Sequence, residues 1–282
     1  MALVKLSELL EQVDNRTGAV GAFNVSNMEM TMGAISAAEE LKTPIILQIA
    51  EGRLAYSPLA LLGPIMVEGA KNANVPIAVH FDHGSTLEKI REALEIGFTS
   101  VMFDGSKYDL EENIRRTKEV KALADEYGAD VEAEIGRVGG AEGDYKSVDI
   151  LLTDVEEAKR FVAETGVAAL AIAIGTAHGN YLKKPELSIT RLKEIAAAVD
   201  CPLVLHGGTG LTEDDFLQCW QNGIRKINIA TASYDNVAKN LKHMAATKPD
   251  ATYFDFSKAA VEGTYENVKK HMFIFKATTI SE

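Results

Sequence analysis

The sequence predicts an α/β fold in which eight parallel β-strands alternate with helices, a TIM (β/α)8 barrel. Three observations support this prediction. The chain has 282 residues, a length typical of one such barrel. Short apolar runs rich in Val, Ile and Ala alternate with longer stretches of helical periodicity. Runs that are apolar throughout are typical of strands buried on both faces of a parallel sheet.

Eight short runs are predicted to be strands, in regular succession along the chain. They lie near residues 19–25, 44–49, 76–81, 100–103, 130–135, 168–174, 202–205 and 226–229. The stretches after them have the apolar periodicity of amphipathic helices. These helices are expected near residues 28–41, 58–71, 87–95, 110–127, 155–164, 189–199, 213–221 and 234–246.

Capping residues support the predicted helix boundaries. Asp109 and Thr212 stand immediately before apolar periodic runs, as helix N-caps do. Gly97 follows a predicted helix, where a left-handed residue commonly ends the last turn. An open doubly wound sheet is the alternative, but no glycine-rich dinucleotide motif follows the first strand. We therefore expect a single barrel domain over residues 1–282, with an extra C-terminal helix near 255–270.

The charge balance and the cysteines limit the possible partners and compartments. A net charge of −12 gives little support for binding to nucleic acid or to an anionic membrane surface. No apolar run approaches the roughly 18–20 residues of a membrane span, and no signal peptide is recognised. The two cysteines, Cys201 and Cys219, do not make a disulfide framework. We expect a cytoplasmic protein with neither a nucleic-acid nor a membrane partner.

Three of the six histidines follow predicted strands. His83, His178 and His206 lie just past the third, sixth and seventh strands, and each is followed by glycine. The carboxyl ends of barrel strands gather at one rim, where this fold carries its chemistry. Three imidazoles with an open fourth position form a catalytic zinc site, so the sequence predicts bound Zn²⁺. The alternative is three separate histidines that cap loops. The remaining histidines are expected in the core (His80) or on the surface of late helices (His243 and His271).

Two carboxylates are candidates for proton transfer. Asp82 directly precedes His83, and a carboxylate beside a Lewis-acidic metal can move a proton next to a polarised carbonyl. Retro-aldol cleavage needs deprotonation of the C4 hydroxyl, which suits Asp82, and stabilisation of an enediolate, which suits zinc. The alternative for Asp82 is a carboxylate that only orients a histidine. Glu142 lies in the polar stretch 136–149 with its four glycines, and is predicted to handle a carbon-bound proton or else to be a solvated loop charge.

Glycines and a helix start at the same rim predict a phosphate site. Backbone amides without bulky side chains in the way are offered by Gly179, Gly207, Gly208 and Thr209. The segment from Asn228 through Ile229 and Ala230 to Thr231 precedes the eighth helix, whose N-terminus attracts anions. Loops after the seventh and eighth strands are the usual phosphate site of this architecture.

Eight segments form a combination of motifs that is specific, although no single segment is. They are GAFNV (21–25), FDHGS (81–85), VMFDGS (101–106), VEAEIG (131–136), GGAE (139–142), GTAHG (175–179), LHGGTG (205–210) and KINIAT (226–231). On these segments the chain resembles class II fructose-bisphosphate and tagatose-bisphosphate aldolases along nearly its whole length. Such enzymes split a ketose 1-phosphate into dihydroxyacetone phosphate and an aldehyde.

The resemblance implies roles for individual residues. It implies that His83, His178 and His206 bind zinc, and that Asp82 is the catalytic acid/base. It implies Asp104 and Glu134 as ligands of a second or alternative metal position. A monovalent cation, Na⁺ or K⁺, is implied near the phosphate, and homodimers or homotetramers are implied for the assembly. The implied dihydroxyacetone phosphate site comprises Asn24, Gly179, Gly207, Gly208, Thr209, Asn228, Ile229, Ala230 and Thr231.

One departure from the family pattern concerns the far end of the substrate. Members that cleave 1,6-bisphosphates usually carry an arginine shortly before the last helix, whereas no arginine occurs here after Arg225. Where some members have a serine at the end of the second strand, this chain has Ala50. Arg53 or Lys258 would replace the missing arginine in part, but a lysine does not reproduce a bidentate arginine contact.

Four hypotheses follow. The first is zinc-dependent cleavage of fructose or tagatose 1,6-bisphosphate. The second keeps the chemistry but gives the aldehyde half a non-phosphate distal group, such as the sulfonate of 6-deoxy-6-sulfofructose 1-phosphate or a carboxylate. The third is a metal-free Schiff-base aldolase using Lys226, which lies two positions before Asn228 and therefore deep in the eighth strand. The fourth is a non-catalytic companion subunit.

Overall fold

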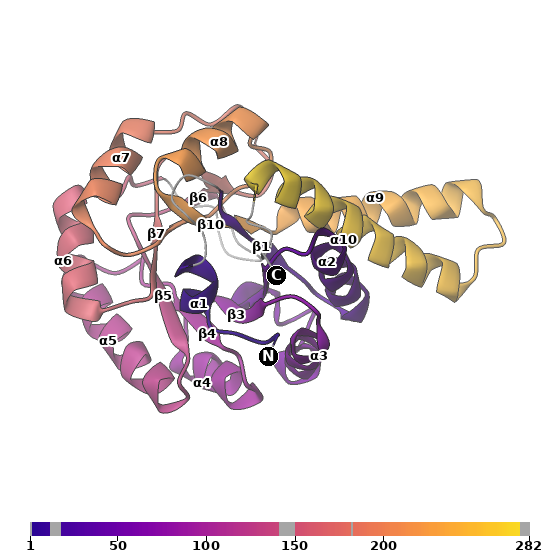
Figure 1. Ribbon diagram of the computed structural model, residues 1–282, viewed down its shortest axis with the longest axis horizontal. Coiled ribbons are helices and arrows are strands. Elements are labelled where there is room, and N and C mark those ends of the chain that lie inside the picture. Colours follow the sequence, from indigo (N-terminus) through magenta and orange to yellow (C-terminus); the bar gives the residue numbers. More distant parts are fainter. Residues whose placement is uncertain (1, 12–17, 141–149, 182, 277–282) are drawn as a thin grey trace.

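The computed structural model describes residues 2–11, 18–140, 150–181 and 183–276. Within these residues, eight parallel strands pair into a closed barrel in the ring order β1-β10-β9-β7-β5-β4-β3-β2. Figure 1 shows this barrel with helices arranged around it. The predicted α/β TIM-barrel fold is confirmed. None of the helices in the described part of the chain has the length and apolar character of a membrane span.

The barrel strands and the helices that follow them form on stretches whose periodicity predicts them. The barrel strands are β1 (Val20–Asn24), β2 (Ile45–Ala50), β3 (Ile77–Gly84), β4 (Ser100–Phe103), β5 (Asp130–Ile135), β7 (Ala169–Ile172), β9 (Leu203–Leu205) and β10 (Ile224–Ile229). The helices after them are α2 (Met28–Leu41), α3 (Leu59–Asn72), α4 (Leu87–Ile96), α5 (Leu110–Glu126), α6 (Val155–Thr165), α7 (Ile189–Ala198), α8 (Glu213–Gln221) and α9 (Thr231–Thr247). A last helix, α10, spans Tyr253–Phe275.

Local hydrogen bonds fix the helix ends. The side chains of Asp109 and Thr212 accept hydrogen bonds from the backbone N–H groups of Glu112 and Asp215, in the first turns of α5 and α8. These bonds satisfy amides that have no partner within the helix. Gly97 ends α4 with φ = 105°, a left-handed conformation that most other residues avoid.

Four short elements were not predicted. A helix α1 (Leu6–Glu11) precedes the barrel, and a 3₁₀ turn η1 (Glu51–Arg53) follows β2. Two residues each of β6 (Gly139–Gly140) and β8 (Ala177–His178) form a separate parallel pair. Short elements of this kind carry too few residues to show a periodicity in the sequence.

The barrel interior changes from apolar to polar along its length. One buried cluster joins α1 to the barrel strands. It contains Leu6, Leu9 and Leu10 of α1 and strand residues such as Val20 and Val204. Toward the carboxyl ends of the strands, buried residues are polar or charged. This layer includes Gln48, His80, Asp82, Glu132, Glu134, His206, Lys226 and Asn228. Since buried charged groups are costly unless they are paired, the polar layer marks the functional end of the barrel.

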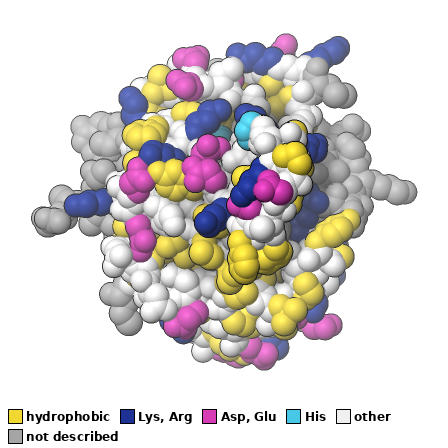
Figure 2. All heavy atoms as spheres, turned by 90° about the vertical axis from the view of Figure 1, so that its right-hand side faces the viewer, with side chains coloured by type: hydrophobic (Ala, Val, Ile, Leu, Met, Phe, Trp, Pro, Cys, Tyr) yellow, Lys and Arg dark blue, Asp and Glu magenta, His cyan; other side chains and the backbone are white. Residues whose placement is uncertain are grey.

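Helices α9 and α10 form a hairpin that projects beyond the barrel, and α10 also packs on α2 (Figure 1). Several large hydrophobic side chains are exposed on this side of the molecule, and Figure 2 shows hydrophobic side chains gathered on the face from which the hairpin projects. The exposed hydrophobic side chains of α2, α3 and the start of α10 are Met28, Met32, Leu61, Ile65, Tyr253 and Phe254.

One histidine lies where it was not expected. His271 on α10 is buried, so its prediction as a surface residue is wrong. The rings of Phe23, Phe216 and Phe275 surround it, with ring centroids 6.5, 6.1 and 5.7 Å away. This position was not evident because α10 packs against β1 and α8, which are far from it in the sequence.

Candidate active site

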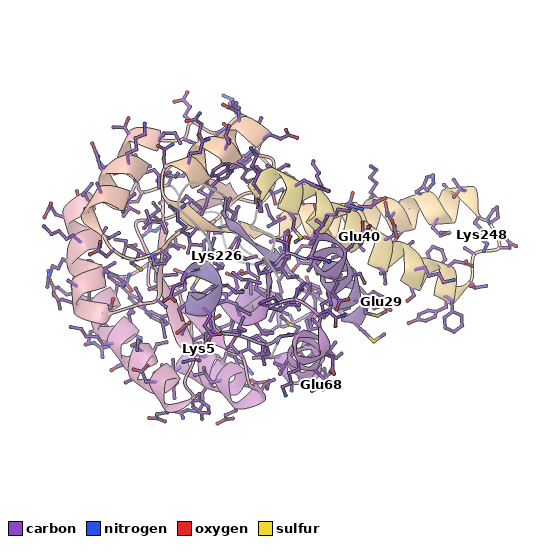
Figure 3. All side chains as sticks on the ribbon, viewed as in Figure 1. Lys5, Glu29, Glu40, Glu68, Lys226 and Lys248 are labelled. Carbon is purple, nitrogen blue, oxygen red and sulfur yellow. The ribbon has the colours of Figure 1, made fainter. Side chains whose placement is uncertain are left out.

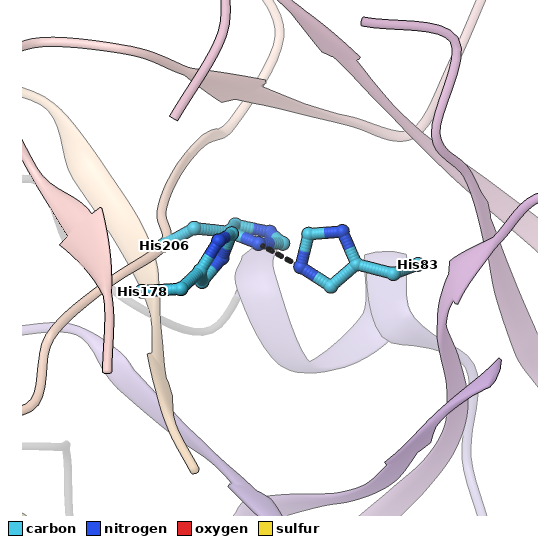
Figure 4. A group of neighbouring side chains, drawn as sticks. All are labelled: His83, His178 and His206. Carbon is cyan, nitrogen blue, oxygen red and sulfur yellow. Dashed lines mark hydrogen bonds between the residues drawn. The ribbon is translucent and has the colours of Figure 1, made fainter. Parts of the chain in front are cut away.

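The three histidines at the strand ends converge. His83 is the last residue but one of β3, His178 ends β8, and His206 directly follows β9. The ring centroid of His83 lies 4.8 Å from the ring centroid of His178 and 4.6 Å from that of His206. One nitrogen from each ring lies within 4.8 Å of the others. Figure 4 shows the three rings meeting at one point, as the ligands of a single metal ion would.

The hydrogen-bond partners of two rings indicate which nitrogens face the centre. His206 Nδ1 and His83 Nε2 are 2.9 Å apart. The outer nitrogens contact carboxylates, because His83 Nδ1 lies 2.9 Å from Asp104 Oδ2 and His206 Nε2 lies 2.9 Å from Glu132 Oε1. An ionised carboxylate only accepts, so each outer nitrogen carries the proton and each inner nitrogen keeps its lone pair. Two facing lone pairs repel each other unless a cation lies between them, so these residues fit a metal ion.

The charge state of the rings also suits a metal. Burial lowers the pKa of His178 and His206 well below the ordinary value. Metal ions bind the neutral form of imidazole. His83 has a backbone φ of 49°, which is uncommon for a residue other than glycine, and such strain concentrates at functional sites.

Asp104 and Glu134 lie together on the outer side of His83. Ligand atoms of His83, Asp104 and Glu134 lie within 4.8 Å of one another, so a second metal group is possible there. Burial raises the pKa of Asp104, but the hydrogen bonds from His83 and Ser106 outweigh burial and lower it. Burial and the Asp104 charge raise the pKa of Glu134 to about 8. The buried Glu134 Oε2 finds no hydrogen-bond donor among the described residues.

Asp82 lies inside the barrel rim with amide donors around its carboxylate. Asn24 Nδ2 donates to Oδ2 at 3.0 Å, Gln48 Nε2 to Oδ2 at 3.3 Å, and Asn228 Nδ2 to Oδ1 at 3.2 Å. Burial raises the pKa of Asp82, but the neighbouring His83, His206 and Lys226 side chains and the hydrogen bond from Asn24 outweigh burial and lower it. The carboxylate is therefore ionised at neutral pH, as a general base must be.

One pocket brings most of the predicted site residues together. Ile229 does not line it, because its side chain is buried in the apolar core. Glu142 lies outside the described residues. The lining residues are Asn24, Asp82, His83, His178, Gly179, His206, Gly207, Gly208, Thr209, Asn228, Ala230 and Thr231.

The glycines beside the histidines allow close approach of backbone to backbone. At Gly207, φ is 71° and an added Cβ would lie 2.5 Å from the carbonyl oxygen of Ala177. An added Cβ at Gly208 would lie 2.8 Å from the carbonyl oxygen of Asn228. Thr209 Oγ1 accepts a hydrogen bond from Ala232 N at 3.1 Å, which ties this loop to the start of α9. The loop and the helix N-terminus thus face one pocket, an arrangement suited to an anion.

Tyr181 supports these loops and was not singled out from the sequence. Its hydroxyl donates to the Gly207 carbonyl at 2.7 Å and accepts from Ala177 N at 2.9 Å. Burial raises the pKa of Tyr181 to about 12. The only sequence feature that could have indicated this contact is the position of the tyrosine, two residues after the Gly-Thr-Ala-His-Gly segment.

Glu132 was not predicted as a site residue, and Lys226 was named only as the lysine of the Schiff-base hypothesis. Lys226 Nζ donates to Glu132 Oε2 at 2.8 Å, and both side chains are fully buried. Figure 3 places Lys226 within the barrel. Since Lys226 is engaged by this ion pair and does not line the pocket, the structure gives no support to its use as a Schiff-base lysine. The period of two along a strand puts Glu132 on the same face as Glu134, which was the available sequence indication.

The two candidate cations for a distal group lie in different places. Arg53, in η1, stacks its guanidinium over the Tyr234 ring at 5.4 Å, and Tyr234 follows Thr231 by one helical turn. Lys258 is exposed and lines a separate hollow of the hairpin with Asn240 and His243.

Comparisons with known proteins agree with this arrangement. The family model described as "Fructose-bisphosphate aldolase class-II" matches residues 4–279. The probable fructose-bisphosphate aldolase of Bacillus subtilis (strain 168) is 39% identical over 255 residues, which cover 89% of each chain. The fructose-bisphosphate aldolase of Geobacillus stearothermophilus is 38% identical over 253 residues, covering 89% of this chain and 88% of that one.

Solved structures are similar over nearly the whole chain. The YdjI aldolase from Escherichia coli K12 has a TM-score of 0.87 and 33% identity, with 98% of both chains covered. A putative fructose-1,6-biphosphate aldolase from Coccidioides immitis has a TM-score of 0.90 and 31% identity, covering 97% of this chain and 96% of that one. Since the match extends along almost the entire sequence, the chain belongs to the class II fructose-bisphosphate aldolase family and is an aldolase.

Proposed function

We propose that the protein is a zinc-dependent aldolase that reversibly cleaves a ketose 1-phosphate to dihydroxyacetone phosphate and an aldehyde. The observation that carries the proposal is the group of three buried histidines with an ionised Asp82 directly before the first of them. We also propose that the whole chain, 1–282, acts as one catalytic domain.

His83, His178 and His206 would hold the zinc ion. When bound, zinc polarises the C2 carbonyl and stabilises negative charge that develops on its oxygen. The inward-facing nitrogens of His83 and His206, 2.9 Å apart, support this assignment. We propose Asp104 and Glu134 as ligands of a second or alternative metal position, because both lie next to His83.

Asp82 would act on the hydroxyl at C4. Its carboxylate takes the hydroxyl proton, the C4–O bond becomes a carbonyl, and the C3–C4 bond breaks. The electron pair of that bond passes to the dihydroxyacetone phosphate half as an enediolate, which then takes a proton at C3. We assign that proton to Glu142, on sequence grounds alone. Amide donors from Asn24, Gln48 and Asn228 hold the Asp82 carboxylate ionised and in place for its step.

The phosphate would be held in the same pocket as Asp82. Gly179, Gly207, Gly208 and Thr209 supply backbone amides. The N-terminus of α9 faces the same space, because Ala230 and Thr231 at its start line the pocket together with Asn228. We place the monovalent cation, Na⁺ or K⁺, beside this phosphate. We place the protein in a reducing compartment, the cytoplasm, because its two cysteines are free and buried.

The distal group of the aldehyde half needs a binding residue other than the usual arginine. A fructose bisphosphate is the substrate in the names of relatives, but this chain lacks an arginine after Arg225. Arg53 is a cation at the rim on the β2 side, because Ala50 at the end of β2 pairs with Asp82 and η1 follows directly. We propose that Arg53 faces the distal group, which is then a phosphate, a sulfonate or a carboxylate.

The substitution Asp82→Ala tests the proposal. General acid–base catalysis contributes roughly 10²–10⁴-fold, so we expect kcat to fall by about that factor while zinc remains bound. Release of dihydroxyacetone phosphate is measured for fructose and tagatose 1,6-bisphosphates, fructose 1-phosphate, and sulfonated and carboxylated analogues, with and without chelator. Unchanged kcat in the variant would remove Asp82 as the base. Chelator-resistant cleavage would remove the metal, and no cleavage of any substrate by the zinc-loaded protein would favour a companion subunit.

A further inference from the structure

Glu132 lies at the centre of a buried charged group beneath the histidines. Its Oε1 is 2.9 Å from His206 Nε2, and its Oε2 is 2.8 Å from Lys226 Nζ. The nitrogen His80 Nε2 is 3.7 Å from Oε2, and His80 Nδ1 lies 2.8 Å from Ser100 Oγ. All of these side chains are at most 1% exposed. These side chains come from β3, β4, β5, β10 and the residue that directly follows β9, so elements from much of the barrel ring meet here.

His206 has a choice of tautomer that Glu132 removes. Either ring nitrogen of a neutral histidine can carry the proton, and the unprotonated one binds metal. Glu132 Oε1 faces Nε2 of His206 and accepts a hydrogen bond from its N–H group. The proton therefore stays on Nε2, and Nδ1 is unprotonated. Nδ1 is the nitrogen that faces His83 Nε2, at the point where the rings converge. With the opposite tautomer, an N–H group would point at the metal position.

Lys226 keeps Glu132 in this role. A buried carboxylate with no opposite charge is strongly disfavoured, and removing the partner of a buried ion pair is more harmful than replacing both partners. Lys226 donates to the oxygen that does not face His206, so the two contacts do not compete. The pair therefore spans the barrel from β10 to β5 and fixes the side chain of Glu132.

We propose that Glu132 is a positioning residue that selects Nδ1 of His206 as a metal-binding atom, with Lys226 holding Glu132 in place. This inference rests on the proposed zinc site. It assigns a function to two residues that contact neither the substrate nor the metal. Partners of metal-binding histidines commonly affect metal affinity by about 10–100-fold.

The substitution Glu132→Gln tests it through metal binding and through the ring itself. Zinc affinity of the metal-free protein is measured by competition with a chromophoric chelator, and we expect it to fall by about 10–100-fold. Side-chain ¹⁵N NMR of the metal-free protein reads the tautomer directly. The wild type should show His206 protonated at Nε2, and the variant should lose that preference. Asp130→Asn is the matched control, because Asp130 lies on the same strand but accepts from Ser7 N at 2.7 Å at the other end of the barrel.

The double variant Glu132→Gln with Lys226→Met covers the case in which the single variant does not fold, since it leaves no unpaired charge. It should show the same loss of zinc affinity and of tautomer preference. Wild-type affinity with an unchanged His206 tautomer in either variant would overturn the inference, and so would an equal loss in Asp130→Asn. If the wild type binds no zinc at all, the zinc part of the proposed function fails, while the tautomer measurement still decides the role of Glu132.

Discussion

The backbone conformation of His83 determines where both nitrogens of its ring lie. Its backbone φ of 49° costs conformational energy, because a Cβ is crowded in the left-handed region. In that conformation its Nδ1 reaches Asp104 at 2.9 Å and its Nε2 faces His206. The register between β3 and β4 also shifts at this point, between Phe81 and Gly84. The strained backbone and the irregular strand end therefore aim the imidazole into the pocket.

Arg53 is the residue on which substrate choice depends in our proposal. Its Nε is buried and finds no acceptor among the described residues, while its guanidinium rests on the Tyr234 ring. The turn that carries it is tied to the loop after β3, because Glu51 accepts from Ser85 N at 2.6 Å and Thr86 Oγ1 at 3.0 Å. Arg53 is thus a hydrogen-bond donor held in place near the strand ends that carry Asp82.

We expect Arg53→Met to lower kcat/KM by about 10–100-fold for ketose 1-phosphates with an anionic distal group, since a hydrogen bond to a charged group contributes about 1.5–3 kcal/mol. Fructose 1-phosphate, which has no distal anion, should be cleaved as by the wild type. Lys258→Met is the matched control, because Lys258 is exposed on the hairpin. Equal effects on both kinds of substrate, or a selective loss in the Lys258 variant instead, would contradict the role of Arg53.

At the scale of elements, short segments place the chemistry. The two-residue strands β6 and β8 pair Gly140 with His178, and Tyr181 connects the loop after β8 to Gly207. These contacts bring His178 toward His206. They are needed because the barrel strand β7 ends at Ile172, before His178 is reached. The barrel strands provide a rigid frame, and the loops with their few hydrogen bonds set the positions of the ligands.

Helix α10 carries a pH-dependent contribution to stability. Burial lowers the pKa of His271 to about 4, although the hydrogen bond to the Asn267 carbonyl opposes this shift. Between pH 6.5 and pH 4 the unfolded chain binds a proton at this residue and the folded chain does not, so stability falls as the pH falls. The loss amounts to at most about 3.5 kcal/mol, because the pKa shifts from 6.5 to about 4 and each unit corresponds to about 1.4 kcal/mol.

We expect His271→Leu to reduce the dependence of the free energy of unfolding on pH in this window. Denaturant unfolding at a series of pH values from 7 to 4 measures it. His243→Leu, at an exposed histidine of α9, should leave the pH dependence as in the wild type. The same slope in the wild type and in His271→Leu would show that other groups determine acid stability.

At the scale of the whole molecule, the hairpin side is the part of the surface that suits a second copy of the chain. The homodimer or homotetramer implied by the resemblance needs an apolar surface that pairs with itself. Leu61 is 69% exposed, and Tyr253 and Phe254 are each 72% exposed. Figure 2 shows hydrophobic side chains gathered on this face, and large exposed hydrophobic patches commonly mark interfaces. We propose that two copies associate through it.

Sedimentation equilibrium at micromolar concentration tests the assembly. We expect the wild type to be a dimer or a tetramer, and Phe254→Asp to shift it toward the monomer, because a charge would be buried in the interface. Tyr127→Asp, at the end of α5 across the barrel from the hairpin (Figure 1), should not change the mass. A monomeric wild type, or a Phe254→Asp variant of unchanged mass, would refute the proposed interface.

The sequence by itself determined the succession of strands and helices and the rim at which the chemistry lies. Apolar periodicity, N-caps such as Asp109 and the glycines after helices act over a few residues, so they can be read locally. The placing of His83, His178 and His206 at one rim could also be predicted, since barrel closure brings the strand ends together.

Only the tertiary structure decided which atoms face each other. Glu132 and Lys226 are 94 positions apart, and their ion pair depends on the register of strands around the closed ring. The same holds for the choice of Nδ1 in His206, for the burial of His271 and for the contact of Arg53 with Tyr234. A local pattern specifies the face of a strand or helix on which a side chain lies. The neighbour that it meets there depends on how elements distant in the sequence pack together.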